Sequence, residues 1–347
     1  MRAFVVKKPF EYGLENVPMP VCAYDGVVVK VLAAAICHSD LDIIEGRRKF
    51  SVRFPNTTGH EFTGVVVEKG AGVRHVRVGD HVVCECIVWC GVCPSCRRGM
   101  TSACEGDLSE LGTMEPGGFA EYAAVPGRLV HPATGLTVEE AALMEPAGNG
   151  CHAAESAGIL TGDRVAVIGP GPIGILAMQF ANIYQPSQLI MVGTRDPRLE
   201  FARRLGATHT VNINKTDAAQ AVMEITGGQG CDRVINCATT DASCALALKI
   251  AGRNSVIAME GVSGSGQTLP VTMDDFNKPI SIVGVNGVYS RHYEQSMALV
   301  REKRVDVKSL ITHRFPLEQM DEALRTMKEK RDEVMKILIF PNGEIRK

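Results

Sequence analysis

Three short segments of the sequence carry side chains that could together hold a catalytic metal ion. His60 and Glu61 follow Gly59, and they place an imidazole and a carboxylate side by side. Cys37 lies upstream of this pair and Glu145 lies downstream. A catalytic zinc ion takes about three such protein ligands and keeps one position open. Each residue alone is more often structural, and because the segments are far apart in the sequence, only a folded domain could bring them together.

A second metal site is indicated by four cysteines within fifteen consecutive residues, Cys90, Cys93, Cys96 and Cys104. Four thiolates at such short spacings can close a tetrahedral zinc site with no open position, which is typical of a structural zinc ion. An iron–sulfur cluster also takes four thiolates, but the spacing and the lack of a following proline suit it less well. Unliganded cysteines in a loop are the remaining alternative.

A glycine-rich turn indicates a dinucleotide-binding site. An apolar segment, residues 164–168, is followed by Gly169, Gly171 and Gly174 and then by a helical pattern over residues 175–184. In this context the glycines permit the turn, the approach of the backbone to a pyrophosphate and the packing of helix on strand. Pro172 and Ile173 complete the turn, and the start of the helix offers amide donors to the phosphates.

The end of the next expected strand bears on the choice of nicotinamide cofactor. An Asp or Glu that binds the ribose hydroxyls is typical about 20 residues after the glycines. Here the chain has Gly193, Thr194 and Arg195 instead, and the first carboxylate is Asp196. A small residue followed by a hydroxyl and an arginine suits a 2′-phosphate, so the segment favours NADP over NAD. In the alternative, Arg195 is a solvated loop charge and Asp196 reaches the ribose.

The pattern of apolar residues predicts two domains of the α/β class. Residues 1–150 contain many short valine-rich strands between glycine and proline turns, which indicates a partly closed, β-rich domain. Residues 151–289 alternate apolar strands with helices, as in a doubly wound parallel sheet. Residues 290–347 begin with a helix and end in a strand at 334–339, which we expect to return to the first domain. The catalytic domain would then comprise residues 1–150 and 290–347.

Composition limits the possible partners. The 347 residues carry a formal net charge of −2 and no block of five like charges, which argues against nucleic acid. No apolar stretch reaches the roughly 18 residues that a membrane span requires. The N-terminus lacks the pattern of a signal peptide, and the cysteines do not suggest disulfides, so we expect a protein of the cytoplasm.

Taken together and in order, these motifs resemble the zinc-dependent medium-chain dehydrogenases over essentially the whole chain. The motifs that carry the resemblance are Cys37-His38-Ser39-Asp40, the glycine signature from Gly59 through Gly64 and Gly70 to Val73, the four-cysteine loop, and Gly169 to Gly174. The resemblance implies a GroES-like catalytic domain, a Rossmann domain, two zinc ions per chain and a homodimer or homotetramer.

The resemblance also implies roles for individual residues. Cys37, His60 and Glu145 would bind the catalytic zinc ion, and Glu61 would bind it or hold its water molecule. Asp40 would orient the ring of His60, and Ser39 would pass the hydroxyl proton of the substrate outward. A zinc ion there would make a bound alcohol acidic, and the nicotinamide would take the hydride.

A glutamate at position 145 is similar to the polyol, threonine and glucose dehydrogenase branches. The segment from Gly284 to Asn286, followed by Arg291 to Glu294, resembles glucose dehydrogenases, in which the asparagine lies near the nicotinamide. A sorbitol-type Phe-Arg-Tyr segment is absent. We therefore predict hydride transfer between NAD(P) and a polyol, sugar or sugar-acid hydroxyl. Candidate pocket residues are Phe54, Trp89, Phe119 and Asn286, and the cations that could meet a sugar acid are Arg47, Arg48 and Lys49.

Two alternatives remain open. One is an amino-alcohol substrate, as in threonine dehydrogenases. The other is a non-catalytic relative that binds nucleotide without turnover, against which the intact set of Cys37, His60, Glu61 and Glu145 argues.

Overall fold

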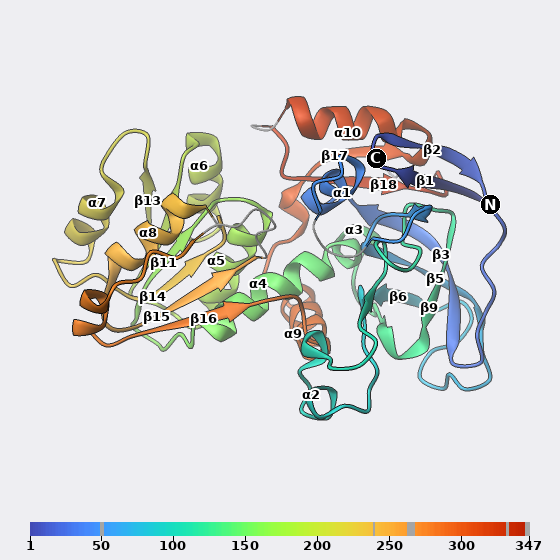
Figure 1. Cartoon of the computed structure of the whole chain (residues 1–347), viewed down its shortest axis with the longest axis horizontal. Coiled ribbons are helices and arrows are strands. Elements are labelled where there is room, and N and C mark those ends of the chain that lie inside the picture. The colour runs from blue at the N-terminus through green and yellow to red at the C-terminus, as the bar shows by residue number, and fades with distance from the viewer. Residues whose placement is uncertain (49–51, 239, 262–267, 331–332, 344–347) are drawn as a thin grey trace. The chain divides into compact units, whose positions relative to one another are not determined.

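The structure is a computed structural model that describes residues 1–48, 52–238, 240–261, 268–330 and 333–343. The chain divides into two compact units (Figure 1). The first comprises Met1–Glu145, Val288–Lys303 and Val307–Lys347, and the second comprises Pro146–Gly287 and Arg304–Asp306.

The first unit is built around a seven-stranded sheet. Its strands follow the order β10-β6-β5-β3-β18-β17, and β9 pairs with β3 outside this path. The strands are β3 (Gly26–Ala35), β5 (Glu61–Lys69), β6 (His81–Cys84), β9 (Tyr122–Pro126), β10 (Val130–Pro132), β17 (Ile311–Pro316) and β18 (Lys336–Phe340).

The centre of this sheet joins segments from opposite ends of the sequence. Strand β3 pairs antiparallel with β5, which places Ala35 opposite Glu61. The same Ala35 lies opposite Leu338 of β18, also antiparallel. The start of β5 and the start of the C-terminal strand β18 therefore lie on either side of the end of β3. The C-terminal strand β18 thus belongs to the sheet of the first unit.

Smaller elements complete the first unit. A three-stranded sheet has the order β2-β1-β4, and β7 pairs with β8. These elements are β1 (Arg2–Lys8), β2 (Glu11–Asn16), β4 (Asn56–Thr57), β7 (Ile87–Val88), β8 (Ser109–Glu110), and the helices α1 (His38–Ile44), α2 (Pro94–Arg97), α3 (Val138–Ala142), α9 (Ser290–Arg301) and α10 (Met320–Glu329).

The second unit is a doubly wound parallel sheet with the strand order β13-β12-β11-β14-β15-β16 and helices packed on it (Figure 1). Helix α4 (Met144–Ser156) begins in the first unit and continues in the second. The other elements are β11 (Arg164–Ile168), α5 (Pro172–Ile183), β12 (Gln188–Gly193), α6 (Asp196–Arg204), β13 (His209–Asn212), α7 (Ala218–Ile225), β14 (Cys231–Asn236), α8 (Asp241–Ile250), β15 (Ala251–Glu260) and β16 (Ile280–Val285).

The order of these six strands makes the second unit a Rossmann fold, and together with the β-rich first unit it confirms the predicted fold class. Because all its neighbouring strands are parallel, their carboxyl ends share one edge of the sheet. Among the described residues, no helix combines the length and the apolar character needed to cross a lipid bilayer.

Candidate active site

The structure brings together Cys37, His60 and Glu61. The Sγ atom of Cys37, one ring nitrogen of His60 and one carboxylate oxygen of Glu61 all lie within 4.8 Å of one another. His60 and Glu61 are buried, and Cys37 is partly buried. Three ligands of different chemistry therefore converge at a spacing that one metal ion could bridge.

The thiol of Cys37 is positioned by the start of helix α1. Cys37 is the residue that precedes this helix, and its backbone N–H donates to Asp40 Oδ2 at 2.9 Å. The other oxygen of Asp40 accepts from the backbone N–H of Gly59 at 3.2 Å. One buried carboxylate thus ties the Cys37 segment to the loop that carries His60. Burial raises the pKa of Asp40, although the attraction of His60 opposes this.

Gly59 is required at the turn before His60. Its φ is +92°, and a Cβ atom there would lie 2.8 Å from the ring of Phe119. Phe119 itself is fully buried in the core of the unit. The prediction that Phe119 lines a substrate pocket is therefore wrong, because its ring fills the space beneath the Gly59 turn.

His60 is surrounded by groups that favour positive charge. Burial works against charge on the ring, but Cys37, Asp40 and Glu145 outweigh it and raise the pKa of His60 well above its usual value. The Nδ1 atom of His60 lies 3.9 Å from Asp40 Oδ1, a distance too long for a hydrogen bond. This Nδ1 atom has no hydrogen-bond partner among the described residues. A buried imidazole with an unused nitrogen, beside a thiol and carboxylates, fits a cation such as zinc.

Glu61 is held by a lysine that the sequence analysis did not select. Lys336 at the start of β18 is buried, and its Nζ donates to both carboxylate oxygens of Glu61, at 2.5 and 2.6 Å. Burial alone would lower the pKa of Lys336, yet the charge of Glu61 raises it. The signal in the sequence was a single cation at the start of an apolar strand, Lys336-Ile337-Leu338-Ile339.

Glu145 does not belong to the group of Cys37, His60 and Glu61, whose ligand atoms lie within 4.8 Å of one another. Its charge nevertheless contributes to the raised pKa of His60. The Sγ atom of Cys86 donates to Glu145 Oε1 at 3.7 Å, and the side chains of Cys86, Glu145 and His60 are all buried. Cys86 contacts the hydroxyl of Tyr293 in turn. Burial, and then the charge of Glu145, raise the pKa of Cys86 well above its usual value, so this sulfur stays a thiol.

Ser39 Oγ is buried and has no hydrogen-bond partner in the part of the chain that the structure describes. Ser39 lies on α1 between Cys37 and Asp40. A hydroxyl in this state can accept and donate a proton when a ligand reaches it.

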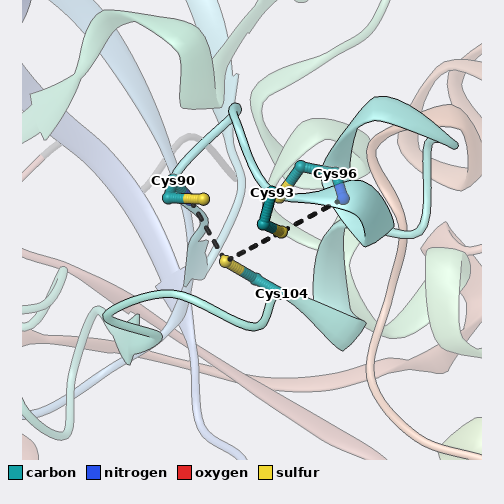
Figure 2. A group of neighbouring side chains, drawn as sticks. All are labelled: Cys90, Cys93, Cys96 and Cys104. Carbon is teal, nitrogen blue, oxygen red and sulfur yellow. Dashed lines mark hydrogen bonds between the residues drawn. The ribbon is translucent and has the colours of Figure 1, made fainter.

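The four cysteines of the second site also converge (Figure 2). The Sγ atoms of Cys90, Cys93, Cys96 and Cys104 lie within 4.8 Å of one another. Backbone N–H groups of Cys96 and Glu105 each donate to Cys93 Sγ at 3.4 Å. These donors lower the pKa of Cys93 to about 6. Such N–H···S bonds stabilise the thiolate form that binds metal, and all twelve cysteines of the chain are free of disulfides.

The glycine-rich turn lies at the carboxyl edge of the Rossmann sheet. Gly171 precedes α5, in which Pro172 is the first residue, followed by Ile173. A Cβ atom on Gly174 would lie 1.9 Å from the carbonyl oxygen of Gly169, whereas one on Gly171 would meet no atom within 4 Å. Gly174 is thus required by the turn itself, while Gly171 leaves open space for a ligand.

The residues at the end of β12 explain why no carboxylate stands there. A Cβ atom on Gly193 would lie 2.5 Å from the ring of Pro170, so an aspartate does not fit. Asp196 accepts from Asn212 at 2.7 Å and pairs with Lys215 at 2.6 Å. Its carboxylate is already engaged by these neighbours.

Thr194 and Arg195 follow Gly193 at the same carboxyl edge, and Asn286 follows β16 there. The structure therefore places all the predicted cofactor residues, from Gly169 to Asn286, at one end of the parallel sheet.

The cations considered for a sugar acid face carboxylates. Arg47 Nη2 lies 2.9 Å from Asp42, and Arg47 also pairs with Glu45. Arg48 Nη2 lies 2.5 Å from Glu110. Lys49 lies outside the described residues.

Two further residues expected in a substrate pocket, Phe54 and Trp89, pack against the core of the first unit as partly buried side chains. Trp89 Nε1 also donates to Glu85 at 3.1 Å.

Comparison with known families supports this architecture. Residues 24–135 match the alcohol dehydrogenase GroES-like domain, and residues 172–302 match the zinc-binding dehydrogenase domain. The chain is similar to a sorbitol dehydrogenase of Bacillus subtilis, with 31% identity over 99% of this chain and 98% of that protein. It is also similar to an L-threonine 3-dehydrogenase of Bacillus velezensis, with 32% identity over 97% and 98% of the two chains.

A solved structure has the same fold. It is a putative zinc-binding dehydrogenase from Sinorhizobium meliloti bound to NADP, with a TM-score of 0.90 and 26% identity over 98% of this chain and 99% of that one. The chain therefore belongs to the zinc-dependent, alcohol dehydrogenase-like family of medium-chain dehydrogenases.

Proposed function

We propose that this protein is a zinc-dependent dehydrogenase that transfers a hydride between the hydroxyl-bearing carbon of a polyol or sugar and NAD(P). The observation that carries the proposal is the convergence of Cys37, His60 and Glu61, with Glu145 close enough to act on His60. In a family of zinc-binding dehydrogenases, this donor set is the one that suits a catalytic metal ion.

The catalytic ion would be held by Cys37, His60 and Glu145, and Glu61 would exchange with Glu145 or hold a water molecule. The pairing of Glu61 with Lys336 supports Glu145 as the resting ligand, because Lys336 already satisfies both oxygens of Glu61. The cysteines Cys90, Cys93, Cys96 and Cys104 would bind a second, structural zinc ion. When bound at the first site, zinc supplies Lewis acidity that lowers the pKa of a substrate hydroxyl.

Other residues of the chain would position the ligands, transfer the proton and bind the cofactor. Asp40 fixes the relative positions of Cys37 and the Gly59–His60 turn through two backbone hydrogen bonds. Ser39 Oγ would receive the hydroxyl proton of the substrate and pass it to solvent, since this buried hydroxyl has no partner among the described residues. The carboxyl edge of the Rossmann sheet would bind the pyrophosphate at Gly171 and the start of α5.

We propose NADP as the preferred cofactor. Gly193 excludes a carboxylate at the position that would bind the 2′-hydroxyl, and Asp196 is engaged by Asn212 and Lys215. Arg195 then supplies positive charge for a 2′-phosphate. The NADP bound to the Sinorhizobium relative supports this assignment.

A polyol or neutral sugar is the substrate class that the site supports best. The guanidinium groups of Arg47 and Arg48 already face carboxylates, which weakens the case for a sugar acid. The similarity to an L-threonine 3-dehydrogenase makes an amino alcohol the second candidate. We also propose a homodimer or homotetramer, which size-exclusion chromatography with light scattering would test.

The experiment is a reduction assay with NAD⁺ and NADP⁺ against polyols, sugars, sugar acids and L-threonine, followed at 340 nm. We expect turnover with at least one polyol or sugar and a higher kcat/KM with NADP⁺. An Arg195→Ala variant should lose this preference while kcat/KM with NAD⁺ is retained. A protein that binds nucleotide but shows no turnover with any of these hydroxy compounds would instead be a non-catalytic relative.

A further inference from the structure

Cys86 lies between Tyr293 and Glu145 and contacts both, and none of the roles proposed above involves it. Cys86 follows strand β6 and is 3% exposed. Its Sγ donates to Glu145 Oε1 at 3.7 Å, within the range of a hydrogen bond from sulfur. A thiol is a weak donor, but a buried carboxylate oxygen needs a donor to offset its loss of water.

Tyr293 on helix α9 holds Cys86 in place. The hydroxyl of Tyr293 accepts from the backbone N–H of Cys86 at 3.3 Å and donates to its Sγ at 3.8 Å. The same hydroxyl therefore fixes the backbone of Cys86 and leaves the S–H free to point toward Glu145. Tyr293 is 1% exposed, so water does not compete for these contacts.

The ring of Tyr293 is fixed by a second layer of buried contacts. It stacks on His131 at a centroid distance of 5.9 Å and an interplanar angle of 8°. His131 Nε2 lies 2.6 Å from Glu85 Oε1, and Ser290 at the start of α9 donates to Glu85 Oε2 at 2.9 Å. Helix α9 and strand β10 are thus joined through one buried carboxylate, which leaves Tyr293 little freedom to move.

We propose that Cys86 and Tyr293 form a clamp on Glu145 that holds its carboxylate in the orientation that binds the catalytic zinc ion. The proposal rests on the function proposed above, because it takes Glu145 to be a zinc ligand. Partners that orient a ligand in this way typically change metal affinity by 10- to 100-fold when removed. A thiol donor lies at the weak end of that range, so the expected effect of its loss is about tenfold.

The test compares variants of the full zinc-loaded protein in which the hydrogen-bond donor is removed or replaced. Cys86→Ala removes the S–H, Cys86→Ser replaces it with an O–H donor, and Tyr293→Phe removes only the hydroxyl. Cys84→Ala is the matched control, because Cys84 is a buried thiol of the adjacent strand that packs in the apolar core. The readout is the affinity for zinc at the catalytic site, measured by competition with a chromophoric chelator.

We expect Cys86→Ala to weaken zinc binding about tenfold, Tyr293→Phe to weaken it less, and Cys86→Ser to stay within about threefold of the parent protein. Cys84→Ala should leave zinc affinity unchanged even though it costs stability. Should Cys86→Ala fail to fold, the comparison of Tyr293→Phe with the parent decides the same point. Equal affinity in Cys86→Ala, or an equal loss in Cys86→Ala and Cys86→Ser, contradicts the clamp.

A Glu145→Ala variant separates the clamp from the proposed function. If it loses zinc while Cys86→Ala and Tyr293→Phe bind normally, Glu145 is a ligand and the clamp is wrong. If it binds zinc as tightly as the parent, Glu145 is not a ligand and the clamp is wrong, whereas a zinc ion held by Cys37, His60 and Glu61 remains. In the double variant Glu145→Ala/Cys86→Ala, the clamp predicts no loss beyond that of Glu145→Ala alone.

Discussion

Replacement of Lys336 by methionine should destabilise the first unit strongly and make its stability depend on zinc. Lys336 and Glu61 form an ion pair whose side chains are 5% and 1% exposed, with both carboxylate oxygens engaged. Loss of one partner of a buried pair typically costs about 3–5 kcal/mol, because the other charge is left without compensation. For a unit of this size, 1 kcal/mol corresponds to roughly 2–4 °C in the melting temperature. The expected decrease is therefore on the order of 10 °C for the zinc-free protein.

Zinc and a second substitution should both reverse this loss. In Lys336→Met the carboxylate of Glu61 is free to approach a cation beside Cys37 and His60, so saturating zinc should recover part of the decrease. Zinc affinity should also rise relative to the parent protein. The double variant Lys336→Met/Glu61→Gln removes both charges and should recover at least half of the lost stability.

The assay is differential scanning calorimetry with and without zinc. It compares four proteins: the parent, Lys336→Met, Glu61→Gln and the double variant. A decrease below about 2 °C in Lys336→Met, or no recovery in the double variant, would refute the argument that this pair is a buried, mutually dependent unit.

Three further predictions follow from local geometry. Cys104→Ser should lower the zinc content from about two ions to about one per chain by elemental analysis, because a closed four-thiolate site loses a ligand; an unchanged content would count against this site. Gly174→Ala should prevent folding of the second unit, as measured by circular dichroism, because its Cβ would lie 1.9 Å from the Gly169 carbonyl oxygen. Gly171→Ala should fold normally and weaken NADP⁺ binding, as measured by calorimetric titration, because its Cβ would meet no atom within 4 Å. Equal behaviour of the two variants would contradict this reasoning. Asp232→Asn should lower the melting temperature at pH 7 by roughly 2–4 °C, because hydrogen bonding to Arg164 lowers the pKa of Asp232. That contribution is present above the unfolded-state pKa of about 3.9 and is lost as the pH falls through the folded-state value, so the two proteins should melt alike near pH 2; a difference that persists there would contradict the assignment.

Local patterns in the sequence predicted the features that depend on nearby residues. The alternation of apolar strands and helices after residue 160 predicted the parallel sheet, because each strand–helix unit carries its own periodicity. Helix α8 ends at Ile250, and β15 begins directly at Ala251 without a loop. Strand β17 and helix α10 were not predicted, since Ile311–Pro316 mixes polar and apolar residues without a clear alternation.

The contacts that the sequence did not reveal join distant segments. Lys336 and Glu61 are separated by 275 positions, and Cys86 and Tyr293 by 207. No periodicity connects such pairs, and only the pairing of β18 and β5 with opposite sides of β3 brings the first pair together. Arg48 is a similar case, because its carboxylate partner Glu110 lies 62 positions away in the sequence.

The most direct measurement of the central claim is anomalous diffraction at the zinc absorption edge from crystals of the full-length protein. We expect two anomalous peaks per chain, one among the four cysteines and one bounded by Cys37 Sγ, the His60 ring and the carboxylate of Glu145 or Glu61. A single peak at the four cysteines, with Cys37 and His60 bound to no ion in zinc-saturated crystals, would contradict the account.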